Sequence, residues 1–363
     1  SKYMNQYYNA LAQKSIEGEI LARKTALEIL ASPEIELLPL LNATFMVRQK
    51  FTGKSVTIHI IDNVENGYCT EDCRYCAQSK NSEASIGKYS IKTDEEILKE
   101  AQSAYENGAF RHCMVFSGQK PSQKRIDHLC ALVKKIKSTV KMELCISTGI
   151  VNEAEARQLK AAGLDRINHN LNTSEKLYPE ICTTHTYQDR LNTLKAAKKA
   201  NLDVCSGVII GMGESHDDII EMALTLREYQ AASIPVNFFI PIEGTGVEKP
   251  QNLTPEFCLR VLCLFRLLNP KAEIRVAAGR EIYLRRMEVL AFYAANSLFL
   301  GGYLNTHGSE TIQTLQMLKD AGFTIESDHS LDQLLEKNKD QHKSTKENNP
   351  YALKSMGDLR PEI

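Results

Sequence analysis

The stretch TDEEILKEAQSAYENGAFRHCMVFS, residues 93–117, contains one helix and the strand that follows it. Thr93 can cap the N-terminus of an amphipathic helix, and Gly108 can end that helix. The run RHCMVFS after the glycine reads as a short β-strand. The same cap-to-glycine pattern returns at residues 152–163 and 311–322, which indicates a fold built from repeated units.

This unit recurs along most of the chain. Short β-rich runs alternate with longer amphipathic stretches between about residues 56 and 321. Roughly eight alternations predict an α/β fold, a parallel (β/α)8 TIM-type barrel, and a doubly wound open sheet is the alternative. The predicted strands are 56–62, 111–117, 141–147, 164–171, 202–210, 234–240, 273–278 and 296–302.

The composition of the two ends differs from that of the middle. Residues 1–55 read as a helical N-terminal extension, because the run EGEILARKTALEILAS is strongly amphipathic. The barrel is predicted over residues 56–325. Residues 326–363 are polar with mixed charges, which predicts a loosely held C-terminal tail.

The bulk composition excludes several classes of function. Lys and Arg (44) nearly balance Asp and Glu (45), so the net charge does not favour nucleic acid or an acidic membrane surface. No apolar run reaches the roughly 18–20 residues of a membrane span, and the first residues lack a signal-peptide pattern. We therefore expect a cytoplasmic protein, in which cysteines serve as metal ligands more often than they form disulfides.

Three cysteines, Cys69, Cys73 and Cys76, follow the first predicted strand at the spacing C-x3-C-x2-C. In a barrel this loop lies on the C-terminal face, where active sites are found. Three thiolates can hold three irons of a [4Fe–4S] cluster and leave one coordination position open. The open position indicates chemistry at the metal, whereas a zinc knuckle or buried thiols are the alternatives.

Four more side chains of interest, Cys113, Cys145, Cys205 and Arg275, lie inside predicted strands. Strand residues alternate between the barrel interior and the helix layer, so each has about an even chance of pointing inward. A single buried cysteine is more often a small hydrophobic residue than a ligand. Their spacing alone does not show that they converge.

The other four cysteines have no predicted ligand role. Three lie in apolar helical stretches and are expected to pack in the core. The fourth, Cys182, lies in a loop, and a structural or incidental role is expected for it. The three core candidates are Cys130, Cys258 and Cys263.

The cysteine loop, with aromatic Tyr75 before its third cysteine, resembles that of the radical S-adenosylmethionine enzymes. Seven segments in order resemble the biotin synthase family from about residue 55 to about residue 325: CTEDCRYCAQS, RHCMVFSG, INHNLNTS, TYQDRL, VCSGVIIGMGE, PVNFFIPIEGT and RVAAGRE. This resemblance implies a sulfurtransferase that inserts sulfur into dethiobiotin to form biotin. S-adenosylmethionine, cleaved at the [4Fe–4S] cluster, would supply the 5′-deoxyadenosyl radical.

The resemblance also implies a second, auxiliary iron–sulfur cluster deep in the barrel, which would be the source of the inserted sulfur. Its ligands would be Cys113, Cys145, Cys205 and Arg275. Arg280 carries the same charge, but the motif match favours Arg275. We expect a [2Fe–2S] type, although three thiolates and an arginine suit more than one type.

The contacts to S-adenosylmethionine implied by the resemblance involve Tyr75, Asn172 and Arg190. Arg190 matches the arginine that binds the cofactor carboxylate through a charge-assisted bond. Asn172 occupies a position where some family members carry an aspartate that binds the ribose. An amide can still bond a hydroxyl group.

Amide side chains are the candidates for binding the substrate. Dethiobiotin carries a ureido ring, and asparagine offers both donors and acceptors without a charge to desolvate. Asn168 and Asn170 would lie on one face of the fourth predicted strand. By resemblance Asn170 and Asn237 hold the ring, Asn168 lies near it, and Thr306 would bind the carboxylate tail.

Two other functions compete with this interpretation. One is a different radical barrel enzyme without sulfur insertion, and the other is a non-catalytic iron–sulfur or zinc protein that carries electrons or metal. The first would not need Cys113, Cys145, Cys205 and Arg275 together. The second would have no open coordination position and no use for Arg190 or the pair Asn168 and Asn170. The remaining expectations, from the resemblance, are a reductase or flavodoxin-type electron donor and a homodimer, with no nucleic acid and no membrane.

Overall fold

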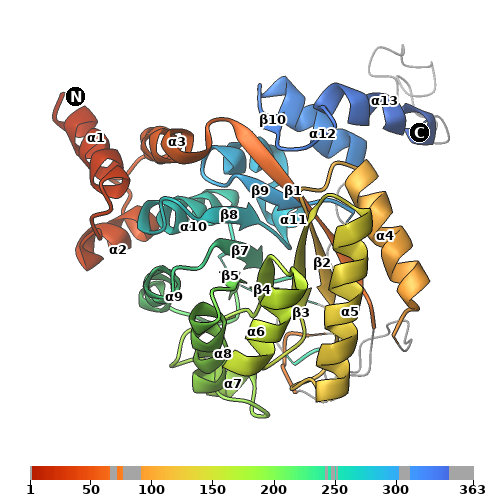
Figure 1. Ribbon diagram of the computed structural model, residues 1–363. Coiled ribbons are helices and arrows are strands. Elements are labelled where there is room, and N and C mark those ends of the chain that lie inside the picture. The colour runs from red at the N-terminus through yellow and green to blue at the C-terminus, as the bar shows by residue number, and fades with distance from the viewer. Residues whose placement is uncertain are drawn as a thin grey trace, which may run out of the picture.

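Parallel strands form a closed ring at the centre of the molecule, and helices surround it (Figure 1). The computed structural model describes residues 2–65, 72–76, 91–241, 244–246, 250, 252–301 and 311–342. The strands are β1 (Ser55–Asn63), β2 (Arg111–Val115), β3 (Glu143–Ser147), β4 (Arg166–Asn168), β5 (Asp203–Cys205), β6 (Val208–Ile210), β7 (Ser233–Phe238), β8 (Glu273–Val276), β9 (Ser297–Phe299) and β10 (Thr324–Ile325).

The ring closes because β1 pairs in parallel with both β2 and β9. Its order is β1-β2-β3-β4-β5-β7-β8-β9, with β6 pairing to β7 and the short β10 lying beside β1. The predicted (β/α)8 barrel is confirmed, and the open sheet is excluded because it would leave β1 and β9 as unpaired edges.

The fifth predicted strand is interrupted, which divides it into β5 and β6. At the break, Ser206 Oγ accepts the Leu171 N–H (3.0 Å), and the Gly207 N–H donates to Asn170 Oδ1 (2.9 Å). A Cβ atom at Gly207 would lie 2.7 Å from the Pro235 carbonyl oxygen, so only glycine fits there. The fourth strand is also shorter than predicted: β4 ends at residue 168, and Asn170 lies in the loop beyond it.

Several helices begin at capping residues, as the sequence predicts. Thr93 Oγ1 accepts the Glu96 N–H (3.2 Å) and Glu96 accepts the Thr93 N–H (2.8 Å), a reciprocal cap. The helices are α1 (Lys2–Ile16), α2 (Arg23–Ala31), α3 (Leu37–Thr52), α4 (Asp94–Glu106), α5 (Gln123–Thr139), α6 (Glu153–Ala162), α7 (Tyr178–Ile181), α8 (Tyr187–Lys199), α9 (His216–Glu228), α10 (Pro255–Leu268), α11 (Arg280–Leu284), the 3-10 helix η1 (Arg285–Tyr293), α12 (Thr311–Asp320) and α13 (Leu331–His342). Among the described residues, none of them combines the length and apolar composition that crossing a bilayer requires.

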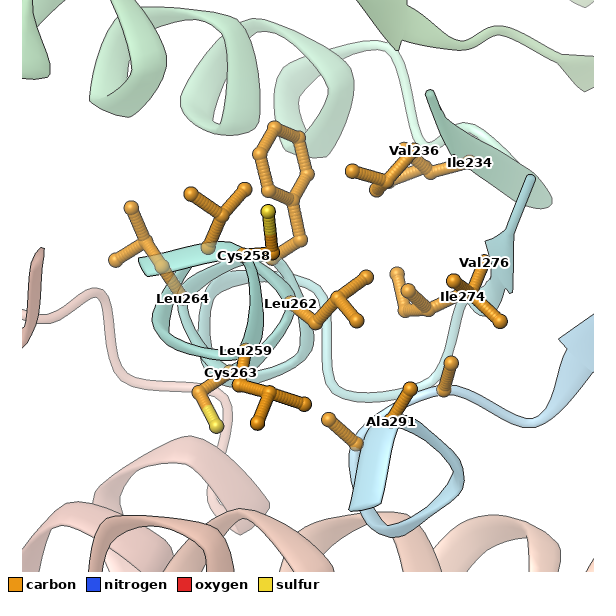
Figure 2. Packing of buried hydrophobic residues seen from close by; sticks show 14 of the residues in the cluster. Ile234, Val236, Cys258, Leu259, Leu262, Cys263, Leu264, Ile274, Val276 and Ala291 are labelled. Atoms are coloured by element: carbon orange, nitrogen blue, oxygen red, sulfur yellow. The ribbon is translucent and has the colours of Figure 1, made fainter. Parts of the chain in front are cut away.

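Helix α10 is buried on all sides, between the barrel and the N-terminal helices. In Figure 2 its Leu262 points toward Ile274 of β8, while Cys258 and Cys263 project from different sides of the helix into apolar surroundings. Both cysteines are fully buried, which confirms their predicted core role, whereas Cys130 on α5 is only half-buried. The predicted helical extension is confirmed as α1, α2 and α3, which pack against α10.

The start of the polar C-terminal segment differs from the loosely held tail expected there. Residues 331–342 form α13, which packs against α12 at one edge of the molecule (Figure 1). Leu331, Leu334 and Leu335 are buried in this contact. The division of the chain at residues 55 and 325 stays a prediction.

Candidate active site

Three thiols converge inside the barrel. Cys113 on β2 and Cys145 on β3 are register partners, and Cys205 ends β5. Their exposed fractions are 5%, 2% and 2%, and the three side chains form a buried cluster. Hydrogen bonding to Cys113, together with burial, raises the pKa of Cys145 well above its ordinary value. Cys145 therefore keeps its proton at neutral pH until a metal displaces it.

Arg275 on β8 reaches the same cluster. Its Nη1 donates to Cys205 Sγ at 3.5 Å, its Nε donates to Ser297 Oγ at 3.0 Å, and its Nη2 lies 2.7 Å from His59 Nε2. Arg280 instead pairs with two glutamate side chains of its own helical segment. Of the two candidate arginines, Arg275 is therefore the one that the fold directs at the thiols.

A buried carboxylate, Glu273, holds a charged network beside the thiols. Its oxygens accept from Arg111 Nη1 and Arg166 Nη1, both at 2.8 Å, and also from Thr57 Oγ1. Burial alone would raise the pKa of Glu273, but the charges of Arg111 and its neighbours hold it well below the ordinary value. Burial lowers the pKa of His59, so its neutral ring accepts hydrogen bonds from the arginines.

This network forms the layer next to the thiols inside the barrel. Arg111 precedes Cys113 by two residues and Glu273 precedes Arg275 by two, and residues two apart on a strand share a face. Removing one partner of a buried ion pair costs about 3–5 kcal/mol of folding stability. The intact pairs therefore hold this layer in place. Sequence reasoning missed it, although charged residues inside predicted strands of a parallel barrel are a signal that they must be paired.

The cysteine loop is described in part. Cys73 is buried and Cys76 is half-buried, and the Cys76 N–H donates to the Cys73 carbonyl at 3.2 Å in a tight turn. Cys69 lies outside the described residues. Between the two cysteines, the Tyr75 hydroxyl accepts a hydrogen bond from Asn172 Nδ2 at 2.6 Å. Two predicted cofactor contacts, far apart in sequence, therefore meet beside the loop.

Arg190, predicted as a cofactor contact, is half-buried, and three hydrogen-bonding contacts hold its guanidinium in place. Its Nη1 donates to the Asn170 carbonyl (2.7 Å), its Nη2 lies 2.8 Å from His185 Nε2, and its Nε donates to the Tyr178 hydroxyl. Burial has the largest single effect and would lower the pKa of Arg190. The electrostatic effects of Tyr178 and Tyr75 together outweigh it, so the pKa lies above its ordinary value. The guanidinium remains a cation that can receive a carboxylate.

The predicted substrate contacts have different environments. Within the described residues, the buried Asn168 Oδ1 has no hydrogen-bond partner. Asn170 Oδ1 accepts the Gly207 N–H. Asn237 bridges strands, because its Nδ2 donates to a carbonyl of β6 (3.2 Å) and its Oδ1 accepts an N–H beyond β8 (3.1 Å). Thr306 lies outside the described residues.

Cys182, expected to be structural, lies against the cysteine loop. Its Sγ is 3.6 Å from Cys73 Sγ, 3.3 Å from His185 Nδ1 and 3.2 Å from Asp72 Oδ1. Hydrogen bonding with Cys73 lowers the pKa of Cys182 to about 4. Burial acts in the opposite direction, and hydrogen bonds with His185 and Thr184 lower the pKa further. The contact with Cys182 raises the pKa of Cys73, whose Sγ is the donor in the pair. No sequence motif linked these two residues.

Comparisons with known proteins agree with this geometry. A sequence model of the radical SAM superfamily matches residues 66–226, and one of the Biotin and Thiamin Synthesis associated domain matches residues 235–324. The biotin synthase of Magnetococcus marinus is 55% identical over 316 residues, which cover 87% of this chain and 98% of that protein. The chain belongs to the biotin synthase family.

Other members of the biotin synthase family are similarly close. The biotin synthase of Acaryochloris marina is 50% identical and covers 86% of this chain and 90% of its own length. Among solved structures, methylornithine synthase has a TM-score of 0.73 at 20% identity, with 86% of this chain and 96% of that chain covered. At that identity the structural likeness supports the barrel fold alone.

Membership of the biotin synthase family implies three bound groups: a [4Fe–4S] cluster, S-adenosylmethionine and an auxiliary cluster. The residues present fit them. Cys113, Cys145 and Cys205 offer three soft ligand atoms in one buried cluster, with Arg275 beside them. At the barrel mouth, Cys73 and Cys76 lie on one turn, within reach of the residues around Arg190.

Proposed function

We propose that the chain is a sulfurtransferase that converts dethiobiotin to biotin by radical-mediated sulfur insertion. The observation that carries the proposal is the meeting of Cys113, Cys145 and Cys205 with Arg275 inside the barrel. A radical enzyme without sulfur insertion has no need of this second ligand set. An electron carrier has no need of the Asn168 side-chain oxygen, which is buried without a hydrogen-bond partner among the described residues.

Two groups of residues hold the clusters in this proposal. Cys69, Cys73 and Cys76 would hold the [4Fe–4S] cluster, and with three protein ligands the cluster could also bind S-adenosylmethionine. The interior thiols and Arg275 hold the auxiliary cluster, for which we propose a [2Fe–2S] type. Bound together, these groups supply the 5′-deoxyadenosyl radical that takes hydrogen and the sulfur that is inserted.

The chain itself positions the substrate between the two ligand sets. Asn168 is the register partner of Cys205 on the neighbouring strand, and among the described residues its buried Oδ1 has no hydrogen-bond partner. An unsatisfied buried acceptor costs about 1–3 kcal/mol, and a ureido N–H would relieve that cost. Asn170 and Asn237 add neutral donors and acceptors around the ring. Thr306 is assigned to the carboxylate tail.

Replacing Arg190 by alanine should weaken binding of S-adenosylmethionine about tenfold to a hundredfold, because a charge-assisted hydrogen bond contributes roughly 1.5–3 kcal/mol. Equilibrium binding to the reconstituted enzyme measures the change. Arg157→Ala, which removes an exposed arginine from the surface of α6, is the matched control and should leave the dissociation constant unchanged. An unchanged constant in the Arg190 variant would contradict its role as a cofactor contact.

Anaerobic reconstitution tests the function as a whole. The loaded enzyme, given S-adenosylmethionine, dethiobiotin and a chemical reductant, should form biotin and 5′-deoxyadenosine and lose sulfide from the auxiliary cluster. Formation of 5′-deoxyadenosine without biotin would favour a different radical enzyme. A paramagnetic spectrum that S-adenosylmethionine leaves unchanged would favour a carrier.

We further infer that a reductase or flavodoxin-type protein supplies the electrons, and that the enzyme works as a homodimer in the cytoplasm. These inferences rest on the family resemblance. Sedimentation of the reconstituted enzyme tests the dimer, and turnover with purified flavodoxin tests the donor.

A further inference from the structure

Cys182 makes a contact that the proposed reaction does not use. Its sulfur lies 3.6 Å from the sulfur of Cys73, a cluster ligand in the proposal above. The two side chains are 4% and 7% exposed. Two sulfurs in a disulfide are about 2.0 Å apart, so a small rotation of the side chains would bring this pair to bonding distance.

The backbone segments that carry the two sulfurs are fastened together on both sides of the contact. The Arg74 N–H donates to the Ile181 carbonyl at 2.9 Å. On the other side, the Asp72 carboxylate accepts the N–H groups of Thr183 (2.8 Å) and Thr184 (3.1 Å). These bonds hold the two segments in register, so the sulfurs stay paired without a rearrangement of the fold.

An alternative interpretation is that Cys73 and Cys182 belong to a metal site. The ligand atoms of Cys73, Cys182 and His185 all lie within 4.8 Å of one another. However, Arg190 Nη2 lies 2.8 Å from His185 Nε2, and arginine can only donate, so Nε2 must accept. The proton of the neutral ring then sits on Nδ1, which faces Cys182 Sγ at 3.3 Å. A protonated Nδ1 donates to sulfur and cannot bind a metal.

We propose that Cys73 and Cys182 form a reversible disulfide when the [4Fe–4S] cluster is absent, and that this bond protects Cys73 from irreversible oxidation. The protective role rests on the proposed function, because it requires Cys73 to be a cluster ligand. The disulfide itself does not. Cys182 thus becomes a partner of the cluster site without ligating the cluster.

The oxidant in this proposal is a peroxide, which is small enough to reach buried sulfur. One thiol takes an oxygen as the O–O bond breaks, giving a sulfenic acid and one water. The second thiol attacks that sulfur, the S–S bond forms, the S–O bond breaks, and the departing hydroxide takes the thiol proton as a second water. Two thiols lose two electrons and one peroxide gains them. Without a partner thiol, oxidation continues to sulfinic acid, which ordinary thiols do not reverse.

The test uses the full chain after its iron has been removed anaerobically with a chelator. Hydrogen peroxide is added, remaining thiols are alkylated, and the peptides are mapped by mass spectrometry. We expect a peptide that joins Cys73 to Cys182. After reduction and reloading, Cys182→Ser should recover severalfold less iron than the wild type and show severalfold more Cys73 sulfinic acid. Cys130→Ser, on α5, is the control and should match the wild type.

Several results would overturn the proposal. The wild-type protein alone can contradict it. This happens if Cys182 is still a free thiol after peroxide and is therefore alkylated, or if Cys73 forms a disulfide with Cys69 or Cys76 instead. Zinc that copurifies and shields Cys182 from alkylation in protein that has not been treated with the chelator, with no S–S bond, would support the metal site instead. Circular dichroism of Cys182→Ser separates a folding defect from a loss of protection. A chain that makes biotin but lacks the disulfide leaves the proposed function standing and removes only this inference.

Discussion

Replacing Cys73 by alanine should abolish cleavage of S-adenosylmethionine, with 5′-deoxyadenosine falling to background. Cys73 is buried in the tight turn after β1, and two remaining thiolates cannot hold a cube with one open corner. The same loss is expected for Cys69→Ala and Cys76→Ala. The measurement is 5′-deoxyadenosine formed by the reconstituted variant under anaerobic reducing conditions, beside its iron content.

The matched control for Cys73→Ala is Cys263→Ala, which removes an equally buried thiol from the apolar core around α10. This control should keep normal cleavage, although it loses a little stability. The circular dichroism spectra of both variants should match the wild type, since neither residue holds a strand of the barrel. Normal 5′-deoxyadenosine production by Cys73→Ala would rule out its assignment as a cluster ligand.

The barrel was predictable because its pattern is local. Each buried parallel strand is a short apolar run, and each helix begins and ends at residues that the sequence displays, as Thr93 and Gly108 do for α4. The break after β5 was not predictable, because it depends on the Pro235 carbonyl that a Cβ at Gly207 would meet. Close approach between strands that are distant in sequence leaves no local trace.

Helix α13 shows a pattern that was present but overlooked. Leu331, Leu334 and Leu335 recur at helical spacing, and all three are buried. The surrounding Lys, Asp and Gln residues gave the segment the composition of a disordered tail. Composition averages over all faces of a helix, whereas burial needs only one apolar face.

The cluster of interior thiols shows what the sequence leaves open. Alternation along a strand says that Cys113 and Arg111 share a face, but not which face, and not what lies opposite. Register supplies the rest by pairing Cys113 with Cys145 and Cys205 with Asn168. In the sequence alone, these residues could be singled out only by the resemblance to the biotin synthase family.

Contacts between segments that are far apart in the sequence were beyond sequence reasoning. Cys73 and Cys182 are separated by 109 residues, and Arg111 and Glu273 by 162. The charged pair left a clue, since both residues lie inside predicted strands where an unpaired charge is too costly. The sulfur pair left none, because a cysteine in a loop is compatible with many roles.

Replacing Cys145 by alanine should stop biotin formation while S-adenosylmethionine is still cleaved. Cys145 hydrogen bonds to both of the other interior thiols, so its loss would remove the middle one of the three ligands proposed for the auxiliary cluster. The residues assigned to the other cofactor, Cys73, Tyr75 and Arg190, lie in different segments and should be unaffected. Separate assays of 5′-deoxyadenosine and biotin measure the uncoupling, beside an iron and sulfide count and an absorption spectrum.

Arg275 provides the graded comparison for Cys145. Arginine rarely gives up its proton, so it is a poorer iron ligand than a thiolate. Arg275→Lys keeps a cation near Glu273 and should weaken or reshape the auxiliary cluster without eliminating turnover. Cys145→Ala should therefore be much the more damaging of the two for biotin formation. If Cys145→Ala kept its second cluster and made biotin at the normal rate, the interior thiols would not be the sulfur source, and the chain would use its barrel for a different radical reaction.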